Sequence, residues 1–150
     1  MSIVVLGAGG YTGSHIVNEL CEREIEVIAV DNLSTGFKEA CHRSARFYQG
    51  DIRDINFLKI VFRKERPDVI IHTALYSGIF ESFKNPLKYY NKNLYGTMVL
   101  LEAIKESEVN KLVFTSSAAV YGKAEKAAVK EDEITEPISQ FGETVLAAGK

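Results

Sequence analysis

The sequence predicts an α/β fold in which a doubly wound parallel sheet of the Rossmann type, with about five strands, lies between helices. Short apolar runs alternate with segments of helical spacing along all 150 residues, which is typical of parallel βαβ units. Runs such as "IVVL" and "DVII" are largely apolar, as expected for strands that are buried on both faces. A glycine-rich turn, "GAGGYTG", joins the first run to the first helical segment.

The first half of the chain is expected to hold three strands and two helices. Ile16, Val17 and Leu20 fall on one side of the first helix. Asp54 is a suitable cap for the second helix, and Pro67 ends it. The expected elements are, in order, a strand at 3–6, a helix at 11–22, a strand at 25–30, a turn-rich segment with at most a short helix, a strand at 45–49 and a helix from 54 to about 65.

The second half is expected to add two strands and two helices. Pro86 is a good first residue for the longest helix, and Gly149 is a suitable stop for the last one. The longest helix would have an apolar stripe formed by Leu94, Met98, Leu101 and Ile104. The expected elements are a strand at 68–72, a long loop to residue 85, a helix at 86–107, a strand at 111–115, a charged surface loop at 123–136 and a helix that begins near Phe141.

Composition excludes several kinds of partner. At 150 residues the chain is expected to form one domain, and its net charge of −2 gives no electrostatic reason to bind nucleic acid or an anionic membrane surface. No apolar run approaches the roughly 20 residues that span a bilayer, and no export signal is seen. Cys21 and Cys41 lie far apart in sequence and the three histidines are scattered, so we expect reduced thiols, no metal site and a cytoplasmic location.

The turn "GAGGYTG" has the spacing that a dinucleotide pyrophosphate requires. Gly7 allows a tight turn, Gly10 lets the backbone approach the pyrophosphate, and Gly13 lets the following helix pack closely. Asp31 ends the second strand, where a carboxylate can accept hydrogen bonds from a ribose diol and would repel a 2′-phosphate. This pattern favours NAD over NADP. The alternative role for Asp31 is a cap of the turn "DNLSTG".

Five stretches resemble, in order and spacing, the extended short-chain dehydrogenase/reductase family, and within it the UDP-sugar 4-epimerases. They are "GAGGYTGSH", "DNLSTG", "GDIRD", "NPLKYYNKNLYGT" and "FTSSAAVYG". The resemblance covers nearly the whole chain and implies the N-terminal NAD-binding part. In that family a tyrosine takes the proton of the sugar 4-hydroxyl while the 4-hydrogen passes to NAD. A lysine four residues later favours the phenolate, and a serine or threonine hydrogen-bonds the same hydroxyl.

The resemblance implies a cofactor site that is largely intact. Four groups of residues match the family's contacts to the cofactor. The pyrophosphate loop corresponds to Gly7, Gly10, Tyr11, Thr12 and Gly13. The segment around the adenosine ribose corresponds to Asp31, Asn32, Ser34, Thr35 and Gly36. The adenine contact corresponds to Asp51 and Ile52, and the loop under the cofactor to Thr73, Ala74 and Leu75.

The sequence departs from the family near the nicotinamide and at the catalytic pair. Lys92 stands where the family has asparagine, and Ser77 stands where it has lysine. Ser117 matches the catalytic serine. The alternative is that this position only needs a small residue at the end of a strand. The family's "YGxxK" falls on "FGETV", so Phe141 and Val145 occupy the tyrosine and lysine positions. Because neither can perform the chemistry, we expect the helix without its catalytic function.

Three functions stay open at this point. The first is an NAD-binding domain without epimerase turnover, and the second is a competent epimerase or reductase that uses Ser117 with Tyr121, another base or a partner chain. The third is an interaction protein that no longer binds NAD. We expect a truncated NAD-binding Rossmann domain over residues 1–150 with the C-terminal UDP-sugar domain absent, and a UDP-sugar is a candidate partner. Since the family pairs the helices at 86–107 and from 141 onward, and exposed sheet edges attract partners, we also expect a homodimer.

Overall fold

The computed structural model describes residues 1–123 and 128–150. The chain forms two compact units, of which the first consists of Met1–Ala74 and Val99–Thr115 and the second of Leu75–Met98 and Ser116–Lys150. Within the described ranges, no helix is long and apolar enough to cross a membrane. The predicted glycine turn belongs to the first unit, and the predicted catalytic positions belong to the second.

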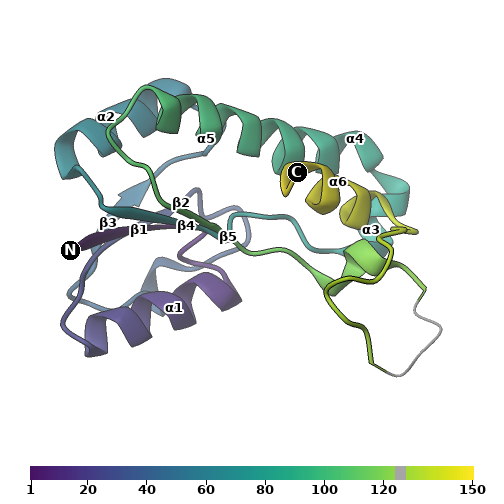
Figure 1. Ribbon diagram of the computed structural model, residues 1–150. Coiled ribbons are helices and arrows are strands. Elements are labelled where there is room, and N and C mark those ends of the chain that lie inside the picture. The colour runs from purple at the N-terminus through teal and green to yellow at the C-terminus, as the bar shows by residue number, and fades with distance from the viewer. Residues whose placement is uncertain (124–127) are drawn as a thin grey trace. The chain divides into compact units, whose positions relative to one another are not determined.

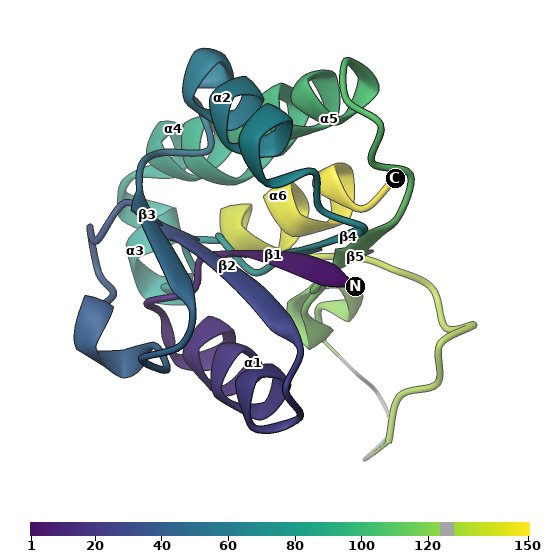
Figure 2. The ribbon, with the colours of Figure 1, turned by 90° about the vertical axis from the view of Figure 1, so that its left-hand side faces the viewer.

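The first unit is built on a five-stranded parallel sheet, which confirms the predicted fold class. The strand order is β3-β2-β1-β4-β5 (Figure 2). The strands are β1 (Ser2–Leu6), β2 (Glu26–Asp31), β3 (Arg46–Gln49), β4 (Val69–His72) and β5 (Leu112–Phe114). In β1, Leu6 pairs with Val30 of β2 on one side and with His72 of β4 on the other. The chain winds outward in opposite directions from β1 and β4, and sheets of this kind bind ligands outside the carboxyl ends of the strands at that point.

Helices cover both faces of the sheet (Figure 1). They are α1 (Tyr11–Glu22) on one face, and α2 (Ile55–Glu65) and α5 (Gly96–Lys105) on the other. Val5 packs in one apolar cluster with Val17 of α1, whereas Val4 packs in the other with Leu58 of α2 and Leu100 of α5. All five residues of β1 are buried. Burial on both faces of the sheet therefore explains the apolar run in this strand, as predicted.

The sequence marks both ends of α2. The Oδ1 atom of Asp54 accepts hydrogen bonds from two backbone amides of the first turn, each at 3.0 Å. At the other end Arg66 adopts the left-handed conformation, with φ 44° and ψ 59°, and its amide donates to the Phe62 carbonyl at 2.9 Å. Pro67 follows and cannot continue the helix.

The second unit consists of helices and loops. Its elements are α3 (Ile79–Lys84), α4 (Pro86–Tyr89), a π-helical turn (Tyr90–Tyr95), a 3-10 turn (Ala118–Tyr121) and α6 (Gln140–Ala148). The fully buried Asn93 ties three segments together. Its amide group accepts from the Tyr76 amide at 2.8 Å and donates to the Tyr76 carbonyl at 3.0 Å and to the Thr144 hydroxyl at 3.1 Å. The loop after β4, the π-helical turn and α6 are therefore held by one side chain.

The predicted long loop at 73–85 is wrong in its second half, because α3 lies there. The apolar side chains of this short helix do not predict it, because they are not buried: Phe80 is 86% exposed and Phe83 is 52% exposed. A helix that does not bury its apolar residues lacks the apolar-inward pattern from which helices are predicted.

The single helix predicted at 86–107 is interrupted and ends at Lys105. Its predicted apolar stripe is wrong at two of four positions, since Met98 is 58% exposed and Leu101 is 46% exposed, whereas Leu94 is half-buried and Ile104 packs against the core. The residues of this helix that are buried instead are Val99, Leu100 and Ala103. A π-helical turn has more residues per turn than an α-helix, so it rotates the face that packs inward away from the position that a regular period predicts.

The remaining predicted segments are confirmed to within a residue or two, except that part of the predicted surface loop at 123–136 lies outside the described residues. Residues 128–136 are mostly exposed, as expected. The final helix begins one residue before Phe141, and its N-cap Ser139 accepts a hydrogen bond from the Gly142 amide at 3.1 Å.

Candidate functional site

The glycine turn leaves β1 in a conformation that requires its first glycine. Gly7 has φ +81°, and a Cβ at this position would lie 2.7 Å from the Cα of Ala74. The amides of Gly7 and Ala8 both donate to the Val30 carbonyl, at 2.8 and 3.1 Å. The turn is thereby fixed between the carboxyl ends of β1, β2 and β4, at the point where a ligand site is expected.

The start of α1 packs against this turn and offers donors to a ligand. A Cβ at Gly13 would lie 2.0 Å from the Gly7 carbonyl oxygen, so only glycine permits this approach. The N-cap is Gly10, which has no side chain to cap the helix. Within the described residues the backbone amides of Tyr11 and Thr12 have no acceptor. Free amides at the positive end of a helix dipole are suited to phosphate oxygens.

Asp31 lies directly beside the glycine turn. Its side chain is almost buried, and Oδ2 accepts a hydrogen bond from the Gly9 amide at 2.9 Å. Oδ1 accepts from the Leu33 amide at 2.7 Å, so Asp31 also caps its own turn, as the alternative reading expected. A carboxylate can accept about four hydrogen bonds, so the two structural contacts leave capacity for a ribose diol.

The segment at 32–36 folds over the glycine turn. The Phe37 amide donates to the Gly9 carbonyl at 3.0 Å, and a Cβ at Gly36 would lie 2.5 Å from the Gly9 carbonyl carbon. Ser34 and Thr35 are exposed beside it, and the Ser34 amide donates to the Asn32 side chain at 3.0 Å. This segment of the predicted ribose site is therefore brought next to the predicted pyrophosphate site.

Asp51 is joined to this segment through the side chain of Asn32. Its Oδ2 atom accepts from the Asn32 side-chain amide at 2.9 Å and from the Arg53 guanidinium at 2.8 Å. The hydrogen bonds with Arg53 hold the pKa of Asp51 well below its usual range. The side chain of Ile52 is buried in the core, so any contact of this residue with a ligand must come from its backbone.

The loop after β4 joins the turn from the other side. The Thr73 hydroxyl donates to the Leu6 carbonyl at 2.7 Å, and the Thr73 amide donates to the same oxygen at 2.9 Å. Ala74 contributes the backbone that excludes a side chain at Gly7. Leu75 begins the second unit.

The predicted catalytic positions lie together in the second unit. Ser117 caps the 3-10 turn, with its hydroxyl oxygen accepting from the Ala119 amide at 3.2 Å. That turn packs against α6, where a Cβ at Gly142 would lie 2.5 Å from the Ala119 carbonyl oxygen. Phe141 is 6% exposed and Val145 is fully buried, so α6 uses both as packing residues. Tyr121 is half-buried at the end of the same 3-10 turn.

Two side chains that stabilise the first unit were not predicted. The Cys41 thiol donates to the Ala8 carbonyl at 3.3 Å, and burial raises the pKa of this thiol. Arg53 holds Asp51 through both carboxylate oxygens. The spacing "GDIRD" could have suggested the second contact, whereas nothing in the local sequence connects Cys41 with the glycine turn. In the part of the chain that the structure describes, no group of three or more His, Cys, Asp or Glu side chains could hold a metal ion.

Known proteins match this chain in sequence over its full length. The family described as "NAD dependent epimerase/dehydratase family" matches residues 3–149. The UDP-glucose 4-epimerase of Lacticaseibacillus casei is 45% identical over 150 residues, covering 100% of this chain and 45% of that protein. The UDP-glucose 4-epimerase of Streptococcus mutans is 48% identical over 149 residues, covering 97% of this chain and 44% of that protein.

Solved structures agree with these matches. The UDP-glucose 4-epimerase of Brucella ovis in complex with NAD shares 35% identity at a TM-score of 0.95, over 99% of this chain and 45% of that one. That of Thermotoga maritima with UDP-glucose shares 35% identity at a TM-score of 0.92, over 99% of this chain and 48% of that one. The chain thus spans about half the length of these relatives. The family is NAD-dependent, in agreement with the predicted cofactor. With its glycine turn, its sheet order and these relatives, the chain belongs to the NAD dependent epimerase/dehydratase family.

Proposed function

We propose that this chain is the NAD-binding part of a protein of the UDP-glucose 4-epimerase type, and that it lacks epimerase turnover of its own. The observation that carries NAD binding is the contact of Asp31 with the Gly9 amide, at 2.9 Å, beside the free N-terminus of α1. A dinucleotide needs an acceptor for its ribose hydroxyls next to donors for its pyrophosphate. The first unit brings both together at the glycine turn.

Different residues of the first unit would bind different parts of the cofactor. The amides of Tyr11 and Thr12 would donate to pyrophosphate oxygens, and the remaining lone pairs of Asp31 would accept from the adenosine ribose. Asp51, kept ionised by Arg53, would accept from the adenine amino group. The glycines fit this role because side chains at Gly7 and Gly13 would collide with backbone and open the turn.

The proposed loss of turnover rests on α6. Bound NAD would supply the hydride acceptor and donor, and the protein must supply a base for the sugar hydroxyl. Phe141 has no phenolate oxygen that could take the proton of the sugar hydroxyl, and Val145 has no ammonium group to favour a phenolate. Both side chains are buried, which supports a packing role for this helix.

Ser117 alone would not replace the missing base. Its hydroxyl oxygen accepts one backbone hydrogen bond and retains its proton for donation to a sugar hydroxyl. A neutral serine can orient that hydroxyl, but it needs a neighbouring base in order to remove a proton. A competent enzyme would therefore require Tyr121 or a partner chain as the base.

The proposal also covers a second ligand and a partner chain. A UDP-sugar would be the second ligand, since a relative has been solved with UDP-glucose. The chain would be cytoplasmic and would form a homodimer. In support of a dimer, the helices of the second unit expose several large apolar side chains, namely Phe80, Phe83, Leu87, Tyr95 and Met98.

A turnover assay tests the proposed loss of catalysis. The protein is incubated with NAD and UDP-galactose, and UDP-glucose is quantified by chromatography. We expect no conversion above the protein-free control, with the same result for Ser117→Ala. Conversion by the unmodified chain that disappears in Ser117→Ala would instead support the competent epimerase. Absence of NAD binding by the folded protein would support the interaction protein.

A further inference from the structure

A pocket of about 510 Å³ lies at the end of the sheet opposite the glycine turn. It is lined by residues that precede β4 and β5, such as Asp68 and Lys111, and by the last turns of α2 and α5. Because the strands are parallel, their amino ends lie at the edge away from Gly7 and Asp31. All the lining residues belong to the first unit. The volume is in the range of small-molecule sites.

The pocket lining combines a larger polar and charged part with a smaller apolar part. Phe62, Ala103 and Val109 are buried and line it with hydrocarbon. Four cationic side chains line the pocket, namely Lys59, Arg63, Arg66 and Lys111. The three acidic side chains that line it are Asp68, Glu106 and Glu108. The pattern suits a ligand with an apolar body and a charged group.

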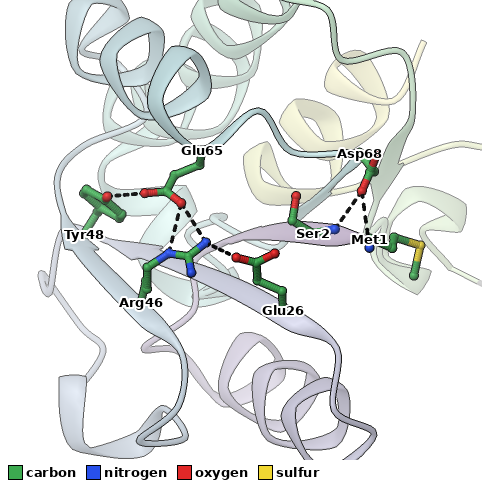
Figure 3. A network of polar contacts seen from close by, with 7 residues as sticks. All are labelled: Met1, Ser2, Glu26, Arg46, Tyr48, Glu65 and Asp68. Atoms are coloured by element: carbon green, nitrogen blue, oxygen red, sulfur yellow. Dashed lines mark hydrogen bonds and ion pairs between the residues drawn. The ribbon is translucent and has the colours of Figure 1, made fainter.

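Most of the acidic charge is already neutralised. Glu106 forms an ion pair with Lys59 at 2.8 Å. Asp68 accepts a hydrogen bond from the Ser2 amide at 2.7 Å and lies 3.9 Å from the N-terminal ammonium of Met1 (Figure 3). Neither carboxylate is therefore available to balance the remaining cations.

The neighbouring glutamate is also engaged. Glu65 accepts hydrogen bonds from Tyr48 and from Arg46, whose guanidinium bridges Glu65 and Glu26 (Figure 3). In the part of the chain that the structure describes, Arg63, Arg66 and Lys111 have no ion pair. The lining side chains are four cations and three acids, and the Met1 ammonium beside Asp68 adds a fifth cation, so the groups at the rim together retain two net positive charges.

The helix ends reduce this charge without reversing it. The C-termini of α2 and α5 each contribute about half a negative charge, which leaves roughly one positive charge at the rim. The backbone at Arg66 forms the C-cap of α2. It is left-handed, with φ 44°, at a position where glycine is the usual residue and a side chain is less favourable.

We propose that this pocket binds a small organic anion, with a phosphate or carboxylate held by Arg63, Arg66 and Lys111 and a small apolar body against Phe62 and Val109. The site is separate from the proposed NAD site, since the two lie at opposite ends of the parallel strands. It therefore stands or falls independently of NAD binding.

Amide chemical-shift titrations test this site directly. Phenyl phosphate and benzoate serve as the two anionic probes, and benzyl alcohol serves as the uncharged one, all in the presence of NAD. We expect saturable shifts for the amides of residues 62–66, 68 and 106–111, and binding of benzyl alcohol about tenfold weaker or more, which corresponds to about 1.4 kcal/mol. The tighter of the two anions identifies the preferred headgroup, and either one supports the site.

Two variants test which cationic side chains bind the anion. Arg66→Gly removes the cation while keeping a residue that favours the left-handed turn, so the fold should be retained, and Lys111→Gln removes the second cation. Each should weaken the better anion about fivefold or more, whereas Arg23→Gln, the same charge change outside the pocket, should leave affinity unchanged. Unchanged affinity in both pocket variants, or shifts confined to residues 7–13, would overturn the proposal.

Discussion

The imidazole of His72 ends β4 and is fully buried. Its Nδ1 atom accepts a hydrogen bond from the Ala74 amide at 3.2 Å, so the proton of the neutral ring lies on Nε2. The ring packs against Phe114, with 5.4 Å between centroids. Burial lowers the pKa of His72 to about 4, because the charged form is poorly solvated there. A neutral histidine therefore stands at the carboxyl end of the strand that leads to Thr73.

The lowered pKa predicts a pH dependence of stability. Below about pH 6.5 the unfolded chain binds a proton that the folded chain does not, so the free energy of unfolding should fall by about 3 kcal/mol between pH 6.5 and pH 4 and be unaffected by His72 at higher pH. In His72→Asn, whose amide oxygen can accept the same hydrogen bond, this part of the slope should disappear. Urea unfolding at a series of pH values measures both, and an identical slope in the two proteins would contradict the assignment.

A substitution at Val145 tests whether this position of α6 serves packing and excludes a charged side chain. Val145→Lys would place an ammonium group at a fully buried position, so we expect a loss of about 3 kcal/mol or more in the free energy of unfolding. Ala147→Lys puts the same side chain on the exposed side of α6 and should change stability by less than about 0.5 kcal/mol. Equal unfolding midpoints for the two variants would mean that the lysine position is still open to a charged group.

At the scale of elements, the close approach of α1 to the glycine turn is the contact on which the cofactor geometry depends. Gly13 and Gly10 lie one turn apart but differ in the space around them. A Cβ at Gly13 would meet the Gly7 carbonyl oxygen at 2.0 Å, whereas one at Gly10 would lie 3.3 Å from the same atom. The first contact requires α1 to move, and the second requires a shift of only a few tenths of an ångström.

These two glycines give a matched pair of variants. Gly13→Ala should lower the unfolding midpoint and weaken NAD binding, because the amides at the start of α1 would be displaced from the turn. Gly10→Ala should change the midpoint much less. Thermal unfolding followed by circular dichroism measures the difference. If Gly13→Ala were as stable as Gly10→Ala, the close packing of α1 on the turn would not be needed for the fold.

The elements that the sequence predicted well are those whose local signals agree with their burial. β1 is buried throughout and apolar from Ile3 to Leu6, and α2 has a capping aspartate at one end and a proline after the other. The residues around Asp31 were predictable because the glycine spacing and the acid lie at fixed places in a βαβ unit. By contrast, α3 keeps Phe80 exposed and the π-helical turn shifts the buried face of the helix that follows. Neither effect follows from a periodic pattern, and the contact of Cys41 with Ala8 depends on tertiary structure alone.

At the scale of the whole molecule, the exposed apolar side chains of the second unit predict self-association. Leu87 is 82% exposed and Met98 is 58% exposed, which is unusual for two large apolar residues in neighbouring helical segments. Light scattering at micromolar concentration should give twice the mass of one chain. The double variant Leu87→Glu with Met98→Glu should shift the protein toward the monomer.

Ile134 provides the control for this experiment. It is 84% exposed and lies in a loop, so Ile134→Glu should leave the mass unchanged. A monomeric unmodified protein at micromolar concentration would rule out the proposed homodimer. The same mass for the double variant and the control would place the interface elsewhere.

The central claim is that the first unit binds NAD through the glycine turn and Asp31. Calorimetric titration of the purified, folded protein with NAD and NADP, alongside Asp31→Asn, measures it most directly. We expect one NAD site per chain, weaker binding of NADP because its 2′-phosphate meets the carboxylate, and about tenfold weaker binding of NAD or more in Asp31→Asn, equivalent to about 1.4 kcal/mol. Absence of NAD binding by the folded protein, or equal affinity in Asp31→Asn, would contradict the account.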